Sequence, residues 1–138
     1  MANSFEKNDI LFGKLRPYLA KVHLAENSGC CTTEALVLRF KIDCKQKYYF
    51  YFLISRRFIN LVNSSVYGSK MPRASWDFIG LQIIPIPPIE EQEKIVEYLE
   101  QKTAEIEALK EKTLQQIEKL KEFKQILIAE AVTGKIKV

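Results

Sequence analysis

Few residues of this chain could perform covalent or acid–base chemistry, and they are scattered. His23 is the only histidine, so a Ser-His-Asp triad would have to use it, yet it falls in a stretch typical of a strand, where a structural or surface role is favoured. The five glycines are dispersed and form no phosphate-binding loop. The three cysteines and the carboxylates of residues 1–88 lack the clustering of a zinc or two-metal site. We therefore predict no catalytic residue, no metal site and no cofactor.

Charge and aromatic content divide the 138 residues into two parts. Residues 1–88 hold 12 Lys and Arg against 6 Asp and Glu, whereas residues 89–138 hold 9 Lys against 11 acids. All five Arg and 13 of the 15 aromatic residues lie in the first part. A positive, Arg-bearing surface permits contact with nucleic-acid phosphates and base edges. We predict two domains with these bounds.

The sequence also bears on localisation. Its start, "MANSFEKNDI", has no basic segment followed by an apolar run, and no stretch approaches the roughly 18 apolar residues that span a bilayer. The cysteines are Cys30, Cys31 and Cys44, an odd count that fits no disulfide framework. We expect a cytoplasmic protein with reduced thiols and no membrane contact.

The first part has the pattern of a small mixed lobe. Strands are predicted at 9–12, 21–25 and 32–42. A capping-box-like pair, Asp43 and Gln46, precedes apolar residues at helical spacing, although the aromatic run at 48–52 could equally be a strand. A loop at 67–76 and an extended segment at 81–87 follow, the latter kept out of a sheet interior by its prolines. We expect the aromatic side chains in the core, namely Tyr49, Phe50, Phe52, Phe58 and Trp76.

The second part predicts one very long helix. Pro88 is tolerated at a helix start, and Glu90 and Glu91 suit the positive end of the helix dipole. No Pro or Gly follows until Gly134, which supplies a stop signal. About 44 residues make a helix of roughly 65 Å. The fold class is therefore α+β: a small mixed lobe followed by one long helix.

An apolar stripe runs along this predicted helix at three- and four-residue steps. A stutter and two lysines, Lys102 and Lys124, interrupt it. The helix could lie on its own lobe, but a helical-hairpin or coiled-coil arm that needs a partner helix is favoured, because the helix is too long for the lobe to cover. The predicted helix–helix interface consists of Ile95, Leu99, Ile106, Leu109, Ile117, Leu120 and Leu127.

Several segments resemble one known family when taken in order. These are "NDILFGKLRPYLAKVHLAE", the region from "YYFYFLISRRF" to "PIPPIEEQEKIVEYL", and the ending "LIAEAVTGKI". The first is similar to the gDIlfsklRPYlgKv segment of type I restriction-modification specificity subunits. The second is similar to the end of their target recognition domain, where an iPlPPleEQ signature leads into a long conserved-region helix. The resemblance runs from about residue 8 to 137.

This resemblance implies a DNA sequence-recognition and assembly subunit that is not an enzyme. Its partners would be double-stranded DNA, methyltransferase subunits and, through them, the restriction subunit. A usual member has two recognition domains spaced by two antiparallel helices. This chain looks like the C-terminal part of one recognition domain and its helix, which would pair with a second copy or another specificity chain. The alternative is a coiled-coil module that binds methyltransferase or specificity subunits without reading DNA.

The candidates for DNA contact are basic and hydroxyl side chains near two turns. Lys and Arg can contact phosphates, Arg can bind guanine through two hydrogen bonds, and Ser can bond to either phosphate or base. An ordinary solvated surface charge is the alternative for each cation, and Arg16 could instead pair with a carboxylate to hold its turn. The candidates are Lys14, Arg16, Lys21, Ser69, Lys70, Arg73 and Ser75.

Overall fold

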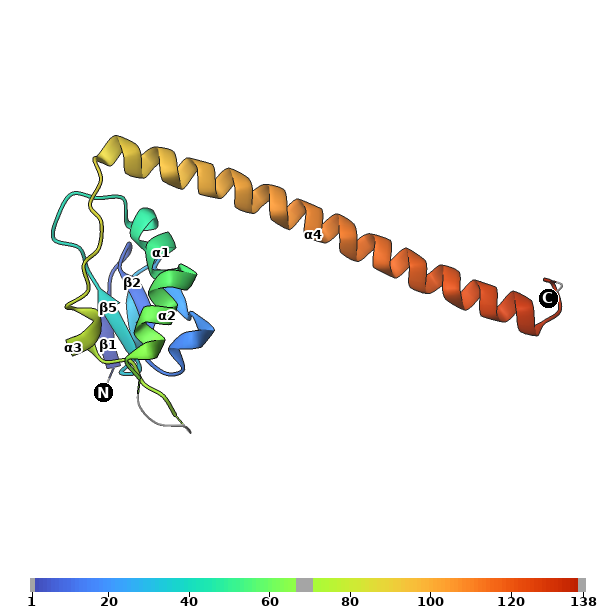
Figure 1. Ribbon diagram of the computed structural model, residues 1–138, viewed down its shortest axis with the longest axis horizontal. Coiled ribbons are helices and arrows are strands. Elements are labelled where there is room, and N and C mark those ends of the chain that lie inside the picture. The colour runs from blue at the N-terminus through green and yellow to red at the C-terminus, as the bar shows by residue number, and fades with distance from the viewer. Residues whose placement is uncertain (1, 67–70, 137–138) are drawn as a thin grey trace. The chain divides into compact units, whose positions relative to one another are not determined.

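The computed structural model describes residues 2–66 and 71–136, which form two compact units, Met1–Val96 and Glu97–Val138. The architecture is α+β, as the sequence predicted, with a strand-and-helix lobe and one long C-terminal helix (Figure 1). The elements in chain order are β1 (Ala2–Phe5), β2 (Ile10–Gly13), η1 (Pro17–Leu19), β3 (Val22–Leu24), β4 (Gly29–Thr32), β5 (Ala35–Leu38), α1 (Gln46–Ile54), α2 (Arg56–Ser64), α3 (Trp76–Ile79) and α4 (Ile89–Val132).

Two small antiparallel sheets form the β part of the lobe. One has the order β3-β2-β5, with Phe12 opposite Val22 on one side and Leu36 on the other, and the second pairs β1 with β4. The sequence predicted β2 and β3 but missed β1 and β4. Three of the four residues in each of these two strands are exposed, so their sequences do not alternate between buried apolar and exposed polar residues. The strand predicted at 32–42 contains β5 but its bounds are wrong, because a turn at 33–34 separates β4 from β5 and β5 ends at Leu38.

The core lies between one face of the three-stranded sheet and the helices α1 and α2. Ile10 and Phe12, two residues apart on β2, point to the same face and are buried. They pack in one cluster with Tyr49 of α1 and with Phe58 and Val62 of α2. The Phe12 and Phe58 rings meet edge to face with centroids 6.2 Å apart. Burial of this cluster is what fixes the two helices on the sheet.

The aromatic run at 48–52 is helical, which excludes the strand alternative. The predicted helical spacing is divided between two helices, because Ser55 leaves helical geometry and separates α1 from α2. The Ser55 hydroxyl accepts a hydrogen bond from the Phe58 N–H at 3.3 Å and so caps α2. The predicted Asp43 cap is also wrong, since Lys45 occupies the N-cap position of α1 and makes no side-chain cap.

Trp76 corrects the expectation that the aromatic residues are all core. Tyr49 and Phe58 are buried, and Phe50 and Phe52 are half-buried against the same cluster, but 54% of Trp76 is exposed. It opens the short helix α3, which was not predicted. Its indole lies against Gly80, where an added Cβ would stand 2.9 Å from the ring. The absence of a side chain at Gly80 thus permits the close approach of the ring.

The bounds of α4 agree with the prediction. The Pro88 carbonyl accepts hydrogen bonds from the N–H groups of Glu91 and Gln92, both at 3.0 Å. At the other end Gly134 adopts a left-handed conformation with φ 74°, and the Lys135 N–H donates to the Glu130 carbonyl at 2.9 Å. That conformation favours glycine, which explains why the helix ends there.

A buried carboxylate anchors the turn between β1 and β2. Asp9 is 3% exposed, and its two oxygens accept hydrogen bonds from Arg39 at 2.8 and 2.7 Å. It also accepts the Glu6 N–H at 2.7 Å. The Arg39 guanidinium, outweighing the opposing effect of burial, lowers the pKa of the Asp9 carboxyl.

This site predicts an acid-sensitive contribution to stability. Because the Asp9 pKa is lower in the folded state than in the unfolded state, the contribution is present above the ordinary carboxyl pKa and is lost as the pH falls below about 4. We expect Asp9→Asn to destabilise the lobe by about 1–3 kcal/mol at neutral pH and to flatten this acid limb. Urea unfolding at several pH values measures both effects. Asp43→Asn, at an exposed position, is the control, and an equal acid limb in both variants would contradict the assignment.

Candidate nucleic-acid interface

Two segments that each carry predicted DNA contacts are joined by their backbones. Leu15 and Arg73 form an antiparallel bridge. The Arg16 N–H donates to the Pro72 carbonyl and the Ala74 N–H donates to the Lys14 carbonyl, both at 2.9 Å. We call this junction of residues 14–16 with 72–74 the basic bridge. It brings Lys14, Arg16 and Arg73 onto one small part of the lobe.

Lys21 lies at the same end of β2. Its carbonyl accepts the Gly13 N–H at 2.8 Å. A Cβ at Gly13 would stand 3.1 Å from both the carbonyl oxygen and the Cβ of Lys21, so the two backbones approach closely. Four of the predicted DNA contacts therefore surround the end of one strand. Ser69 and Lys70, which were also predicted, lie outside the described residues.

Arg16 has an unusual backbone conformation. Its φ is 54° and its ψ 65°, in the left-handed region that L residues with a side chain rarely adopt. The Pro72 carbonyl and the Leu19 N–H, which donates to the Arg16 carbonyl at 2.9 Å, hold it there. The exposed Arg16 side chain makes no ion pair with any described residue, so the alternative of a carboxylate partner finds no support within this part of the chain.

Arg73 and Ser75 already have partners in the lobe. An Arg73 Nη2 atom lies 3.1 Å from Glu34 Oε1. The Ser75 hydroxyl caps α3, accepting the Asp77 N–H at 3.2 Å and lying 3.3 Å from an Asp77 carboxylate oxygen. Glu34 was missed by the sequence analysis, because a single acid in a turn has no distinguishing local pattern.

A polar depression adjoins the basic bridge. It has a volume of about 460 Å³ and shares Lys14 with the bridge. Asn3, Ser4 and Thr33 provide its other polar side chains. Hydroxyl and amide groups of this kind can bond to bases or phosphates, so the depression extends the polar surface around Lys14.

The junction between lobe and α4 is built on Gln92, which is 1% exposed. Its side-chain oxygen accepts the Lys45 N–H and its amide donates to the Pro87 carbonyl, both at 2.9 Å. Lys45 and Glu93 also form an ion pair at 2.5 Å. The first turn of α4 is thereby tied to the start of α1 and to the proline segment before it. Gln92 was not among the predicted site residues.

The predicted interface residues of α4 differ in exposure. Ile95 is half-buried and packs against the lobe core, and Leu99 is half-buried. The remaining five keep 40–67% of their area exposed: Ile106, Leu109, Ile117, Leu120 and Leu127. Phe123, which was not predicted, is 56% exposed and widens the stripe, since it lies three residues from Leu120 and four from Leu127.

Comparison with known proteins identifies the family of this chain. The family described as the type I restriction modification DNA specificity domain matches residues 2–119, most of the chain. The chain belongs to this family. The sequence-based resemblance is confirmed, and with it the expectation of a specificity component that is not itself catalytic.

Two relatives of the type I specificity domain indicate how much of a longer protein it matches. It is 24% identical over 134 residues to the type I restriction enzyme EcoDI specificity subunit of Escherichia coli, covering 97% of this chain and 30% of that protein. It is also similar, with a TM-score of 0.83 and 23% identity, to a chain in a solved structure that concerns complex assembly and conformational transition of the type I R-M system. That match covers 94% of this chain and 35% of the solved one. The domain thus spans about a third of each relative.

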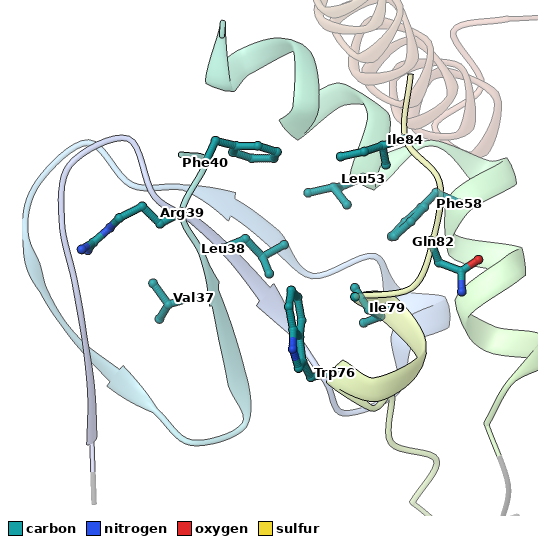
Figure 2. A pocket seen from close by; sticks show the side chains of 11 residues that line it. Val37, Leu38, Arg39, Phe40, Leu53, Phe58, Trp76, Ile79, Gln82 and Ile84 are labelled. Carbon is teal, nitrogen blue, oxygen red and sulfur yellow. The ribbon is translucent and has the colours of Figure 1, made fainter. Parts of the chain in front are cut away.

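An apolar pocket of about 340 Å³ lies elsewhere on the specificity domain (Figure 2). Figure 2 shows Trp76 and Ile79 facing Leu38 of β5 across it, with Leu53 and Phe58 behind. Among the described residues that line it, Arg39 is the only charged one, and it is paired with Asp9. The described lining therefore offers no carboxylate, histidine or lysine for acid–base chemistry. No cluster of metal-ligating side chains occurs in residues 2–66 and 71–136, and no helix there is long and apolar enough to cross a membrane.

Proposed function

We propose that this chain is a DNA sequence-recognition and assembly subunit of a type I restriction-modification complex. The lobe reads one half-site of a double-stranded target, and α4 spaces that half-site and assembles the complex. The observation that carries the proposal is the basic bridge, because it joins two separately predicted DNA-contact segments at one place. Membership of the specificity-domain family supports the same conclusion.

The basic bridge offers two kinds of contact. Lys14 and Lys21 are point charges suited to phosphates, whereas Arg16 and Arg73 can bind a guanine edge with two hydrogen bonds. The strained backbone of Arg16 costs free energy in the free lobe. Such strain is typical of functional positions, and here the strained residue is hydrogen-bonded through its N–H to Pro72, the residue before Arg73.

For assembly, the exposed stripe of α4 requires a partner helix. We propose a second copy of this chain or another specificity chain, with methyltransferase subunits docking on α4 and its junction and bringing in the restriction subunit. If two copies pair antiparallel, their two-fold symmetry requires an interrupted palindromic target.

A second candidate function is an interaction module that binds methyltransferase or specificity subunits without reading DNA. One observation favours it: the side chains of Arg73 and Ser75 already have partners within the lobe. Duplex binding separates the two functions.

Removing an arginine of the basic bridge is expected to weaken DNA binding. Arg16→Gln should cost about 5- to 150-fold in affinity for the preferred duplex, corresponding to about 1–3 kcal/mol for a lost bidentate base contact. Lys14→Gln should instead weaken all duplexes alike and reduce the slope of log affinity against log salt by about 0.9. Fluorescence anisotropy of labelled duplexes at several salt concentrations measures both.

The control for both variants is Arg57→Gln, which removes one exposed positive charge from α2, outside the bridge. Equal losses in Arg16→Gln and Arg57→Gln would show that only overall charge matters. Absence of binding by the unaltered chain, with complex formation intact, would favour the second function.

A further inference from the structure

We infer that Glu34 is a positioning residue that orients Arg73 for reading a guanine base, an inference that rests on the proposed function. Glu34 lies in the turn between β4 and β5, and Arg73 lies on the basic bridge. Their side chains meet with Arg73 Nη2 3.1 Å from Glu34 Oε1.

Both ends of this pair are held by backbone hydrogen bonds. The Glu34 carbonyl accepts the Lys14 N–H at 2.8 Å, and the Lys14 carbonyl accepts the Ala74 N–H at 2.9 Å. Lys14 therefore joins the backbone of Glu34 to the residue that follows Arg73. Because these backbone bonds join the two segments, the Cα atoms of Glu34 and Arg73 are held at a fixed separation, from which the two side chains meet.

The contact leaves most of the guanidinium available. Arg carries five N–H donors in a planar fork, and the described structure assigns one nitrogen, Nη2, to Glu34. The Arg73 side chain is 58% exposed, so its other donors can reach a ligand in the solvent. A guanidinium held from one side loses less rotamer freedom when it binds, and it presents its fork in one direction.

Stabilisation of the lobe does not explain why the acid is there. Glu34 Oε2 is buried without a hydrogen-bond partner among the described residues, which is unfavourable for a carboxylate oxygen. The ion pair is partly exposed on both sides, and such pairs contribute little to stability. A neutral side chain of similar size would fill the same space at lower cost.

The carboxylate also discriminates between ligands. A negative charge beside Arg73 repels a phosphate that approaches the bridge, whereas the neutral acceptors O6 and N7 of guanine are not repelled. Glu34 thus lowers affinity for DNA in general and raises the advantage of a duplex with guanine at the right position. A residue with only a structural role would change both affinities in parallel.

The test uses the full chain and a pool of duplexes with a randomised central segment. Sequencing of the bound fraction gives the preferred duplex, and anisotropy gives the ratio of its affinity to that of the unselected pool. Glu34→Gln is expected to bind the pool as tightly as the unaltered chain or more tightly. Its ratio of affinity for the preferred duplex to affinity for the pool should fall about tenfold, which lies within the discrimination that one bidentate base contact provides.

Three further variants make the result specific. Glu34→Asp keeps the carboxylate and should retain most of the ratio. Arg73→Lys keeps the charge but loses the fork, and adding Glu34→Gln to it should change the ratio no further, since Glu34 acts through Arg73. Glu26→Gln is the control. It removes an equal charge after the C-terminal end of β3, whereas Lys21 precedes the N-terminal end, and it should leave the ratio unchanged.

Each outcome is decisive. A ratio unchanged in Glu34→Gln overturns the inference while leaving DNA reading intact, and so does a parallel loss of both affinities. If Glu34→Gln does not fold, equal ratios for Arg73→Lys and the unaltered chain overturn it instead. No duplex preference in the unaltered chain overturns the proposed base reading itself, which is a distinct result.

Discussion

Replacing Leu109 and Leu120 of α4 together by Ala is expected to abolish association of this chain through its long helix. Both side chains lie on the apolar stripe and are 65% and 67% exposed in the single chain. If a partner helix covers these side chains, each truncation to Ala should reduce the free energy of association by about 2–5 kcal/mol. The two sites are roughly 16 Å apart along the helix, so the losses should add.

Sedimentation equilibrium over a wide concentration range measures this loss directly. We expect the dissociation constant to rise by at least about 700-fold, since 4 kcal/mol corresponds to nearly three powers of ten. The matched control combines Glu111→Ala with Glu122→Ala, which shortens two exposed side chains away from the stripe without lowering helix propensity.

The outcomes distinguish kinds of partner. If the control weakens association as much as the leucine variant, the stripe is not the interface. If the unaltered chain stays monomeric at high concentration, pairing with a second copy is wrong, and the partner helix must come from a different specificity chain. Mixing with such a chain then repeats the same comparison.

Replacing Gln92 by Leu is expected to cause a large loss of stability at the junction between the lobe and α4. Leu has a similar volume but leaves the Lys45 N–H and the Pro87 carbonyl without their partner. Each buried unsatisfied group costs about 1–3 kcal/mol, so the total for the two groups should be about 2–6 kcal/mol. Glu93→Gln, which removes only the half-exposed ion pair with Lys45, should cost about 0–1 kcal/mol.

Two signals follow this unfolding separately. Trp76 is the only tryptophan and lies in the lobe, so its fluorescence reports on the lobe, whereas circular dichroism at 222 nm is dominated by the 44-residue helix α4. Gln92→Leu should lower the denaturant midpoint of the fluorescence transition. A midpoint equal to that of Glu93→Gln would show that the two hydrogen bonds of Gln92 do not hold the junction.

Elements marked by local sequence signals were predicted well, whereas elements that depend on contacts with distant residues were not. Pro88 and Gly134 mark the bounds of α4 locally, so the start and the end of α4 were predicted to within one or two residues. The strands β1 and β4 escaped prediction because each is exposed along most of its length and is recognisable only by its pairing with the other. Ser55 shows the intermediate case, since a serine can either continue a helix or cap the next one.

The sequence by itself determined that the chain has a compact basic lobe and one long helix with an apolar stripe, because periodicity, proline and glycine act locally. The family resemblance was also available from ordered motifs. Only the tertiary structure decided that Arg16 and Arg73 share one place, that Glu34 holds Arg73, and that Gln92 ties α4 to α1. These contacts join residues far apart in the chain, and their partners are chosen by how the core packs rather than by any local pattern.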